Sequence, residues 1–136
     1  MEPLKILIAE DDKDDLEFLK FLFERHPSFE VLRTISDGEE ICKEILERGT
    51  RPRILLTDNY MPKLTGTKAV QLLSVAGVLQ KTAVIVLSGG ESDSEQSEIE
   101  SLPGIHFLKK PSNLTEINDL PEKILDLLSY GNVNRI

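Results

Sequence analysis

Five short apolar segments, separated by stretches with helical periodicity, are the feature that most restricts how this chain of 136 residues can fold. Each segment is about four to seven residues long, which suits a strand and is too short for a buried helix. Their nearly continuous Ile, Leu and Val content indicates strands that are buried on both faces. The predicted strands cover residues 5–9, 29–35, 53–57, 83–87 and 105–108.

Large apolar residues recur at three- and four-residue steps between these runs, as in amphipathic helices. Helices are predicted at residues 12–24, 39–48 and 67–75, and a further one near the C-terminus. Pro27 ends the first helix and Gly49 ends the second. The faces expected to point inward are Leu16, Leu19, Leu22 and Phe23, widened by Phe18 and Phe21, in the first helix, Ile41, Ile45 and Leu46 in the second, and Val70 and Leu73 in the third.

The last third of the chain gives weaker signals. The final helix is expected to be built on Ile124, Leu125, Leu127 and Leu128. Asp119 with Glu122 is predicted to cap it, because Pro121 is tolerated only in a first turn. Residues 91–101 contain a single large apolar residue, so we expect a short, frayed helix there. The flexible pair Gly89-Gly90 further predicts that residues 89–101 are mobile.

Strands that alternate with helices favour an α/β fold, in which right-handed crossovers place helices on both faces of a parallel sheet. The length of the chain fits one domain with a single core. We therefore expect one domain over residues 1–136, with a core at about 4–129 and a short tail at 130–136.

The balance of charge excludes several functions. A formal net charge of −8 disfavours direct binding to nucleic acid or to anionic membranes, which bind through clustered Lys and Arg. No apolar run is long enough to span a bilayer, and the first residues lack the layout of a signal peptide, so we expect a cytoplasmic protein. The single cysteine, Cys42, has no second Cys with which to form a disulfide.

Polar side chains follow four of the predicted strands where each strand ends: Glu10 and Asp11, Asp58, Ser88, and Lys110. Because the carboxyl ends of parallel strands meet at one edge of the sheet, these groups are expected to lie together. Two carboxylates about 4 Å apart repel by on the order of 4 kcal/mol at an effective dielectric of about 20, so three of them call for a cation. Mg²⁺ is the natural candidate, because it prefers hard oxygen ligands.

Four fragments, taken in order, resemble the receiver domains of two-component response regulators. They are Ile-Leu-Ile-Ala-Glu-Asp-Asp at 6–12, Leu-Leu-Thr-Asp-Asn-Tyr-Met-Pro at 55–62, Val-Leu-Ser-Gly-Gly at 86–90 and Phe-Leu-Lys-Lys-Pro at 107–111. The resemblance extends from about residue 4 to 129. It implies a doubly wound (βα)5 fold whose five-stranded parallel sheet has the strand order 2-1-3-4-5.

The resemblance also implies a chemistry. Asp58 would accept a phosphoryl group from a histidine kinase or a histidine phosphotransfer protein. Mg²⁺ would be held by Glu10, Asp11, Asp58 and the backbone carbonyl of Tyr60. Lys110 would contact one phosphoryl oxygen.

A conformational switch is implied as well. Ser88 would move toward the phosphoryl group and bind another of its oxygens. The aromatic side chain of Phe107 would then turn into the space that this movement vacates. The altered face, formed by the fourth helix, the fifth strand and the fifth helix, would be read by partner proteins. The downstream partner is left open, as is a phosphorylation-dependent homodimer. On this interpretation the protein is a stand-alone regulator that turns over no outside substrate.

Three other functions compete with this one. An aspartyl-phosphate phosphatase would usually carry a second acid two residues after its nucleophile, where this chain has Tyr60. A flavodoxin-like cofactor binder needs a phosphate-cradling loop after the first strand, where Glu10, Asp11 and Asp12 would repel a phosphate. The remaining alternative is a receiver-like binding module that is never phosphorylated.

Overall fold

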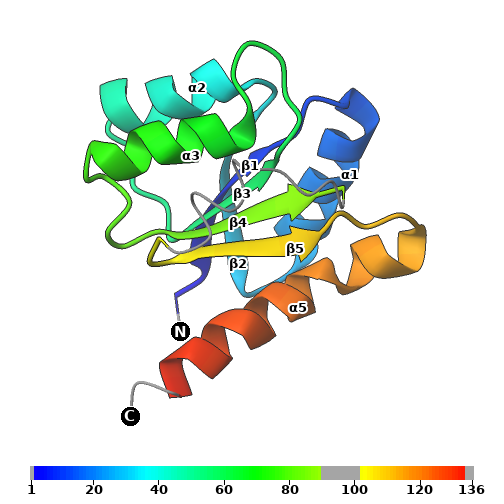
Figure 1. Cartoon of the computed structure of the whole chain (residues 1–136). Coiled ribbons are helices and arrows are strands. Elements are labelled where there is room, and N and C mark those ends of the chain that lie inside the picture. The colour runs from blue at the N-terminus through cyan, green and yellow to red at the C-terminus, as the bar shows by residue number, and fades with distance from the viewer. Residues whose placement is uncertain (1, 90–101, 134–136) are drawn as a thin grey trace.

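The computed structural model describes residues 2–89 and 102–133. Its centre is a parallel sheet of five strands in the order β2-β1-β3-β4-β5, which confirms the predicted topology (Figure 1). The strands are β1 (Leu4–Ala9), β2 (Phe29–Ile35), β3 (Ile54–Asp58), β4 (Ala83–Ser88) and β5 (Ile105–Lys109). Their bounds agree with the predicted strands to within one residue, and β3 extends to include Asp58 itself.

Helices cover both faces of the sheet (Figure 1). They are α1 (Lys13–Arg25), α2 (Gly38–Cys42), which continues into a wider π-type turn η1 (Lys43–Glu47), α3 (Gly66–Val75) and α5 (Leu114–Val133). The predicted helix at 91–101 lies outside the described residues, as does the predicted mobility of 89–101 except for Gly89. No helix in the described part of the chain is long and apolar enough to cross a membrane.

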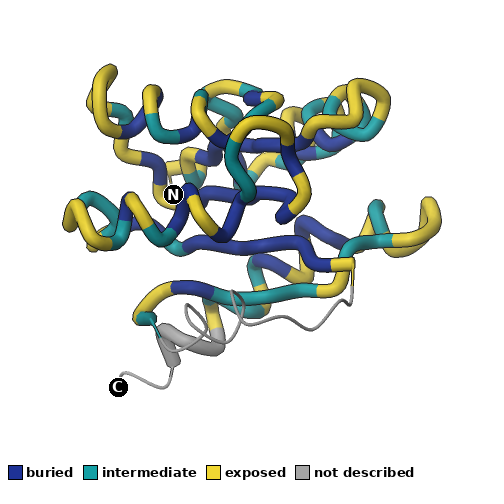
Figure 2. Tube along the Cα trace, turned by 45° about the horizontal axis from the view of Figure 1, so that its top comes forward, coloured by how far each residue is buried: buried dark blue, intermediate teal, exposed yellow. Residues whose placement is uncertain are grey.

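Successive side chains of each strand serve opposite faces of the sheet, as the pleat requires. Leu7 and Leu55 pack with Ile41 and Val70 beneath α2 and α3. On the other face, the alternate strand residues pack against α1 and α5. That second cluster comprises Ile6, Ile8, Leu19, Phe23, Phe29, Ile54, Leu56, Ile85, Leu87, Leu120 and Ile124. Figure 2 shows the resulting burial, with the strands dark blue at the centre of the molecule.

Two predicted core residues face solvent instead. Leu46 is 47% exposed, because the wide turn η1 places Glu44 and Ile45 on the buried side and rotates the next residue outward. Phe21 is also exposed, since Leu19 and Phe23 complete the buried stripe of α1. The guanidinium of Arg25 lies 5.0 Å from the centre of the Phe21 ring, which gives this aromatic side chain a cation–π contact in place of core packing.

The start of α5 corrects a second prediction. The helix begins at Leu114, and its N-terminus is capped by Asn113, whose Oδ1 accepts a hydrogen bond of 2.9 Å from the Glu116 N–H. The Glu116 carboxylate in turn accepts from the backbone N–H of Ser112 at 2.8 Å. Pro121 is therefore a buried residue inside the helix, and the predicted cap at Asp119 and Glu122 is wrong.

Glu44 is a buried carboxylate that apolar periodicity does not reveal. Its oxygens accept hydrogen bonds from Thr50 Oγ1 at 2.6 Å, Arg33 at 2.9 Å and Arg48 at 3.0 Å. The hydrogen bond from Thr50 and the two guanidinium charges lower the pKa of Glu44, although burial acts in the opposite direction. This network ties the edge strand β2 to the turn that precedes β3.

Gly38 marks a close approach between the start of α2 and the loop that joins β3 to α3, at the edge of the sheet where the polar residues lie. A Cβ at this position would lie 2.0 Å from the carbonyl oxygen of Leu64. We therefore expect Gly38→Ala to lower the free energy of unfolding by about 3 kcal/mol, because two backbones must separate. Gly77 is the matched control: its φ is +73° but its surroundings are open, so Gly77→Ala should cost only about 1 kcal/mol. Urea denaturation measures both, and equal losses would contradict the close approach.

Candidate functional site

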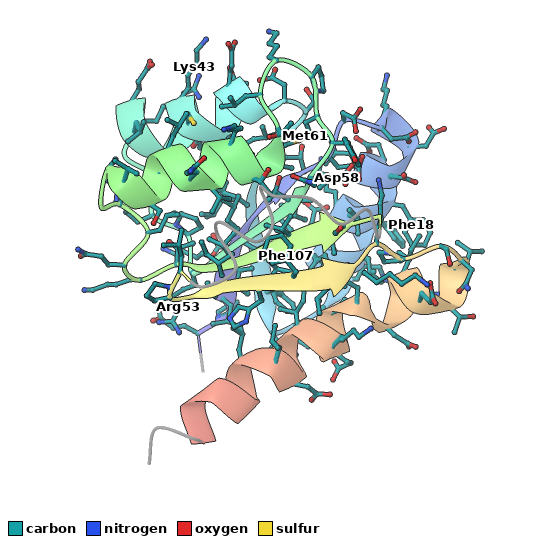
Figure 3. All side chains as sticks on the ribbon, in the orientation of Figure 1. Phe18, Lys43, Arg53, Asp58, Met61 and Phe107 are labelled. Carbon is teal, nitrogen blue, oxygen red and sulfur yellow. The ribbon has the colours of Figure 1, made fainter. Side chains whose placement is uncertain are left out.

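The polar residues predicted to converge do lie at one rim of the sheet. Glu10 directly follows β1, Asp58 ends β3, Ser88 ends β4 and Lys110 directly follows β5. In Figure 3 Asp58 lies at the end of the sheet where the strand arrows point. Because all strands run in parallel, their last residues arrive at the same edge. The positions of these four groups follow from topology alone.

Three carboxylates form the centre of the rim. One oxygen from each of Glu10, Asp11 and Asp58 can be chosen so that all three lie within 4.8 Å of one another. Glu10 is 1% exposed and Asp58 is 3% exposed, whereas Asp11 is open to solvent. Two of the three acids are therefore removed from water and lie in the protein interior, where the repulsion between like charges is stronger.

Glu10 is the carboxylate most affected by this arrangement. Burial raises its pKa to about 7, and the charge of Asp58 adds to the rise. The Asp12 N–H, which donates to Glu10 Oε2 at 3.0 Å, and the charge of Lys110 both act to lower the pKa. The net rise shows that burial and the charge of Asp58 outweigh these two favourable contacts.

Lys110 is the cation within the cluster. Its Nζ lies 3.0 Å from Asp58 Oδ2 and 3.3 Å from Glu10 Oε1, so one ammonium bridges two buried acids. Burial lowers the pKa of Lys110, but the hydrogen bond to Asp58 and the two negative charges outweigh it, and the net pKa is raised. The backbone N–H of Lys110 donates to the Ser88 carbonyl at 2.8 Å, which fixes the base of this side chain to the end of β4.

The main chain around Asp58 is held by polar contacts that sequence reasoning missed. Thr57 Oγ1 donates to the carbonyl of Asp58 at 2.9 Å. Asn59 accepts hydrogen bonds from the first residues of α3. A Cβ on Gly66 would lie 2.4 Å from the Asp58 carbonyl oxygen, so the start of α3 packs directly on the strand end. The available signal was the unbroken polar run of Thr57, Asp58 and Asn59 at the end of an apolar strand.

The other predicted residues occupy different surroundings. Ser88 is buried at the end of β4, beside Lys109 in the β4–β5 register. Phe107 lies back from the rim, in the middle of β5 opposite Val86, and is half-buried against the core beneath α2 and α3 (Figure 3). The side chain of Tyr60 is 57% exposed. The proposed role of the Tyr60 carbonyl as a metal ligand stays a prediction.

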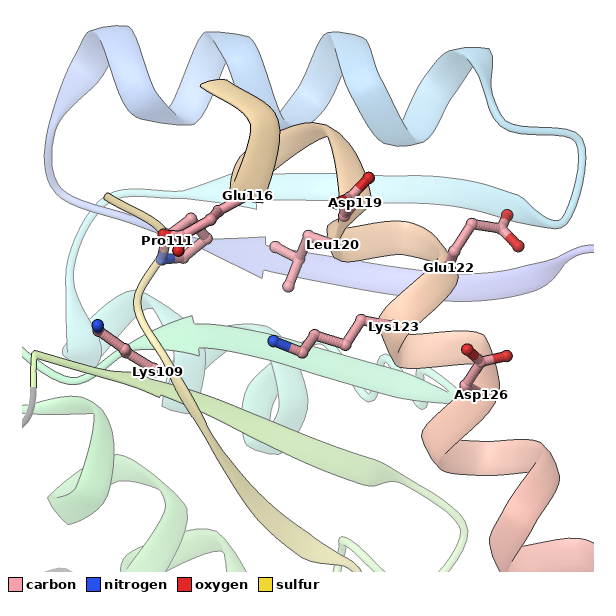
Figure 4. Close-up of a pocket in the computed structure, with 8 residues that line it drawn as sticks. All are labelled: Lys109, Pro111, Glu116, Asp119, Leu120, Glu122, Lys123 and Asp126. Carbon is pink, nitrogen blue, oxygen red and sulfur yellow. The ribbon is translucent and has the colours of Figure 1, made fainter. Parts of the chain in front are cut away.

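A separate pocket of about 320 Å³ lies between the end of β5 and the first half of α5 (Figure 4). Its lining residues are Lys109, Pro111, Glu116, Asp119, Leu120, Glu122, Lys123 and Asp126. None of the rim residues takes part in it. The candidate site at the rim is therefore distinct from this pocket.

Comparison with known proteins identifies the class of this fold and site. The model of the response regulator receiver domain matches residues 6–121. The chain belongs to this family of signalling domains, as the sequence fragments predicted.

Particular relatives agree with this assignment. The chain is 25% identical to the response regulator domain of Thermotoga maritima CheB, with a TM-score of 0.72 and coverage of 93% of this chain and 95% of that one. It is 27% identical to the receiver domain of Francisella response regulator 1452, with a TM-score of 0.73 and coverage of 94% and 98%. A protein-glutamate methylesterase/protein-glutamine glutaminase of Nitrosospira multiformis is 33% identical over 92 residues, which are 68% of this chain and 24% of the relative. The chain spans only 24% to 35% of the length of the curated relatives it matches.

Proposed function

We propose that this protein is a phosphoacceptor switch of a two-component phosphorelay, in which Asp58 accepts the phosphoryl group of a phosphohistidine donor. The observation that carries this proposal is the position of Lys110 Nζ, 3.0 Å from Asp58 within a cluster of three acids. A buried carboxylate beside an ammonium, within a cluster of three acids that calls for a divalent cation, suits a metal-assisted phosphoacceptor better than a simple structural ion pair.

The proposed step forms one bond and breaks one. An oxygen of the Asp58 carboxylate attacks phosphorus, the bond between phosphorus and the imidazole nitrogen breaks, and the nitrogen keeps the electron pair. The product is an acyl phosphate on Asp58 and a free histidine on the donor. Lys110 would place its ammonium beside a phosphoryl oxygen, where its positive charge stabilises the negative charge that develops during transfer.

The acidic cluster fits a resident Mg²⁺ ion. Its donors are hard carboxylate oxygens, and they are too few for a closed Ca²⁺ cage. Glu10, Asp11, Asp58 and the carbonyl of Tyr60 would hold the ion, whose charge would offset the repulsion among the three carboxylates. When bound, Mg²⁺ supplies the positive charge that offsets the phosphoryl oxygens.

Signal output is proposed to pass through partner proteins. Ser88 would bind a phosphoryl oxygen and Phe107 would turn, altering the face made by the predicted fourth helix, β5 and α5. Phosphorylation must favour the active state by about 5.5 kcal/mol to reverse a 1:99 population, which a few charge-assisted hydrogen bonds can supply. The proposed donor is a histidine kinase or a histidine phosphotransfer protein in the cytoplasm. The net charge of −8 disfavours nucleic acid as the direct target.

The test is the intact mass of the protein after incubation with acetyl phosphate, with Mg²⁺ or with a chelator. We expect the protein to gain the mass of one phosphoryl group in the incubation with Mg²⁺ and no mass in the incubation with the chelator. A protein that gains no mass under either condition would instead be a receiver-like binding module. Continuous release of phosphate at many turnovers per molecule would favour the phosphatase alternative.

A further inference from the structure

Asn59 follows the proposed phosphoacceptor and precedes Tyr60, whose carbonyl is the proposed metal ligand. We propose that Asn59 is a positioning residue that sets the main chain of both neighbours through its side-chain amide. This inference rests on the proposed function, because it concerns how Asp58 and Tyr60 are presented to the metal and the phosphoryl group.

Within the described part of the chain, three hydrogen bonds hold Asn59. Its backbone N–H donates to the carbonyl of Leu87 in β4 at 3.1 Å, and its carbonyl accepts from the Gly66 N–H at 2.9 Å. Its side-chain Oδ1 accepts from the Thr67 N–H at 3.1 Å. The residue is only 6% exposed. One residue is thus joined to β4 on one side and to the first turn of α3 on the other.

These bonds fix the two peptide planes that meet at the Cα of Asn59. Peptide units are rigid, so the chain here can move only by rotation about φ and ψ of this residue. Rotation about φ reorients the peptide that joins Asp58 to Asn59, and rotation about ψ reorients the peptide that leads to Tyr60. A change in either dihedral angle of Asn59 therefore displaces a neighbouring proposed metal ligand, Asp58 or the Tyr60 carbonyl.

Only one of the three bonds depends on the identity of the side chain. An apolar residue at position 59 would keep both backbone bonds and leave the buried Thr67 N–H without its acceptor. The first turn of α3 would then have to shift to find another partner. Gly66 packs directly on the Asp58 carbonyl, so that shift would be transmitted to the strand end.

A role limited to stabilising α3 can be separated from positioning. Thr65 also caps α3, because its Oγ1 accepts from the Lys68 N–H at 3.1 Å. The Thr65 hydroxyl also lies 3.3 Å from the Thr67 hydroxyl, and within the described residues its side chain forms no hydrogen bond with β3. Thr65→Ala is therefore the matched control, since it removes an equivalent cap from the same helix end without altering Asn59.

The experiment measures Mg²⁺ binding by calorimetry on the unphosphorylated full chain, for wild type, Asn59→Leu, Asn59→Ala and Thr65→Ala. We expect about tenfold weaker Mg²⁺ binding in both Asn59 variants, as is typical when support behind a metal ligand is removed. Backbone amide NMR signals of Asp58 and Tyr60 should shift in these variants. Thr65→Ala should bind Mg²⁺ like wild type, although urea denaturation shows a similar loss of stability.

Wild-type Mg²⁺ affinity in a folded Asn59 variant would overturn the positioning role, as would equal weakening by Thr65→Ala. Asn59→Ala adds no bulk, so it decides the matter if Asn59→Leu does not fold. A wild-type protein that neither binds Mg²⁺ nor gains a phosphoryl group would refute the proposed function itself. A wild type that is labelled normally beside unaffected Asn59 variants would refute only the role of Asn59.

Discussion

Asparagine in place of Asp58 is expected to abolish phosphorylation completely. The amide oxygen and nitrogen are far weaker nucleophiles than a carboxylate. Glu10 is the other buried acid of the rim that contacts Lys110, and its pKa is raised to about 7. Wild type should gain one phosphoryl group in the intact-mass experiment, and Asp58→Asn should gain none. Hydroxylamine should remove the group from wild type, because it cleaves acyl phosphates.

Asp14→Asn provides the control for this substitution. Asp14 is an exposed acid in the first turn of α1, outside the three-carboxylate cluster. Its replacement removes the same charge from the same side chain type, and labelling should proceed as in wild type. A phosphoryl group that still appears on Asp58→Asn would place the acceptor elsewhere and remove the main support for the proposed mechanism.

Lys110→Met is expected to change two measured quantities in opposite directions. Phosphorylation at saturating Mg²⁺ should slow by about 100-fold, the usual cost of removing one preorganised group that stabilises developing charge. Mg²⁺ should bind several-fold more tightly, because the ammonium that lies 3.0 Å from Asp58 and 3.3 Å from Glu10 no longer repels the cation. A merely structural lysine would weaken both quantities together.

Lys109→Met is the matched control for Lys110. The neighbouring lysine lines the pocket beside α5 and, within the described part of the chain, forms no ion pair with the carboxylate cluster. We expect its rate of phosphorylation and its Mg²⁺ affinity to equal those of wild type. If Lys110→Met is phosphorylated at the wild-type rate, the bridging ammonium has no role in transfer.

The sheet and its rim could be predicted from sequence because both depend on local patterns. The run 83–87 is apolar on both faces of the strand, so its composition identifies it without any knowledge of its neighbours. Parallel topology then brings Glu10, Asp58, Ser88 and Lys110 to one edge. The distances among them, and the bridging position of Lys110, required the structure.

Other features depend on contacts that no local pattern encodes. Glu44 is buried because Arg33 and Thr50, which come from different elements, both reach it. His26 Nε2 lies 2.5 Å from Glu122 Oε2 and joins the end of α1 to α5 across 96 residues of sequence. The start of α5 was predictable in principle, since Asn113 and Glu116 have the spacing of a capping pair. The cap was predicted at Asp119 and Glu122 because Pro121 was expected to lie in the first turn, whereas it lies inside the helix.

Pro121 divides α5 into two mechanical parts. Proline has no N–H, so the carbonyl of Ile117 loses the bond that would close that turn. Most residues from 114 to 119 are exposed, whereas Leu120 and Ile124, on either side of the proline, are buried in the same core cluster. The missing hydrogen bond weakens the link between the exposed start of α5 and the buried turns that follow it. A rearrangement that begins near Lys110 would therefore displace the first turn of α5 more easily than the turns held in the core by Leu120 and Ile124.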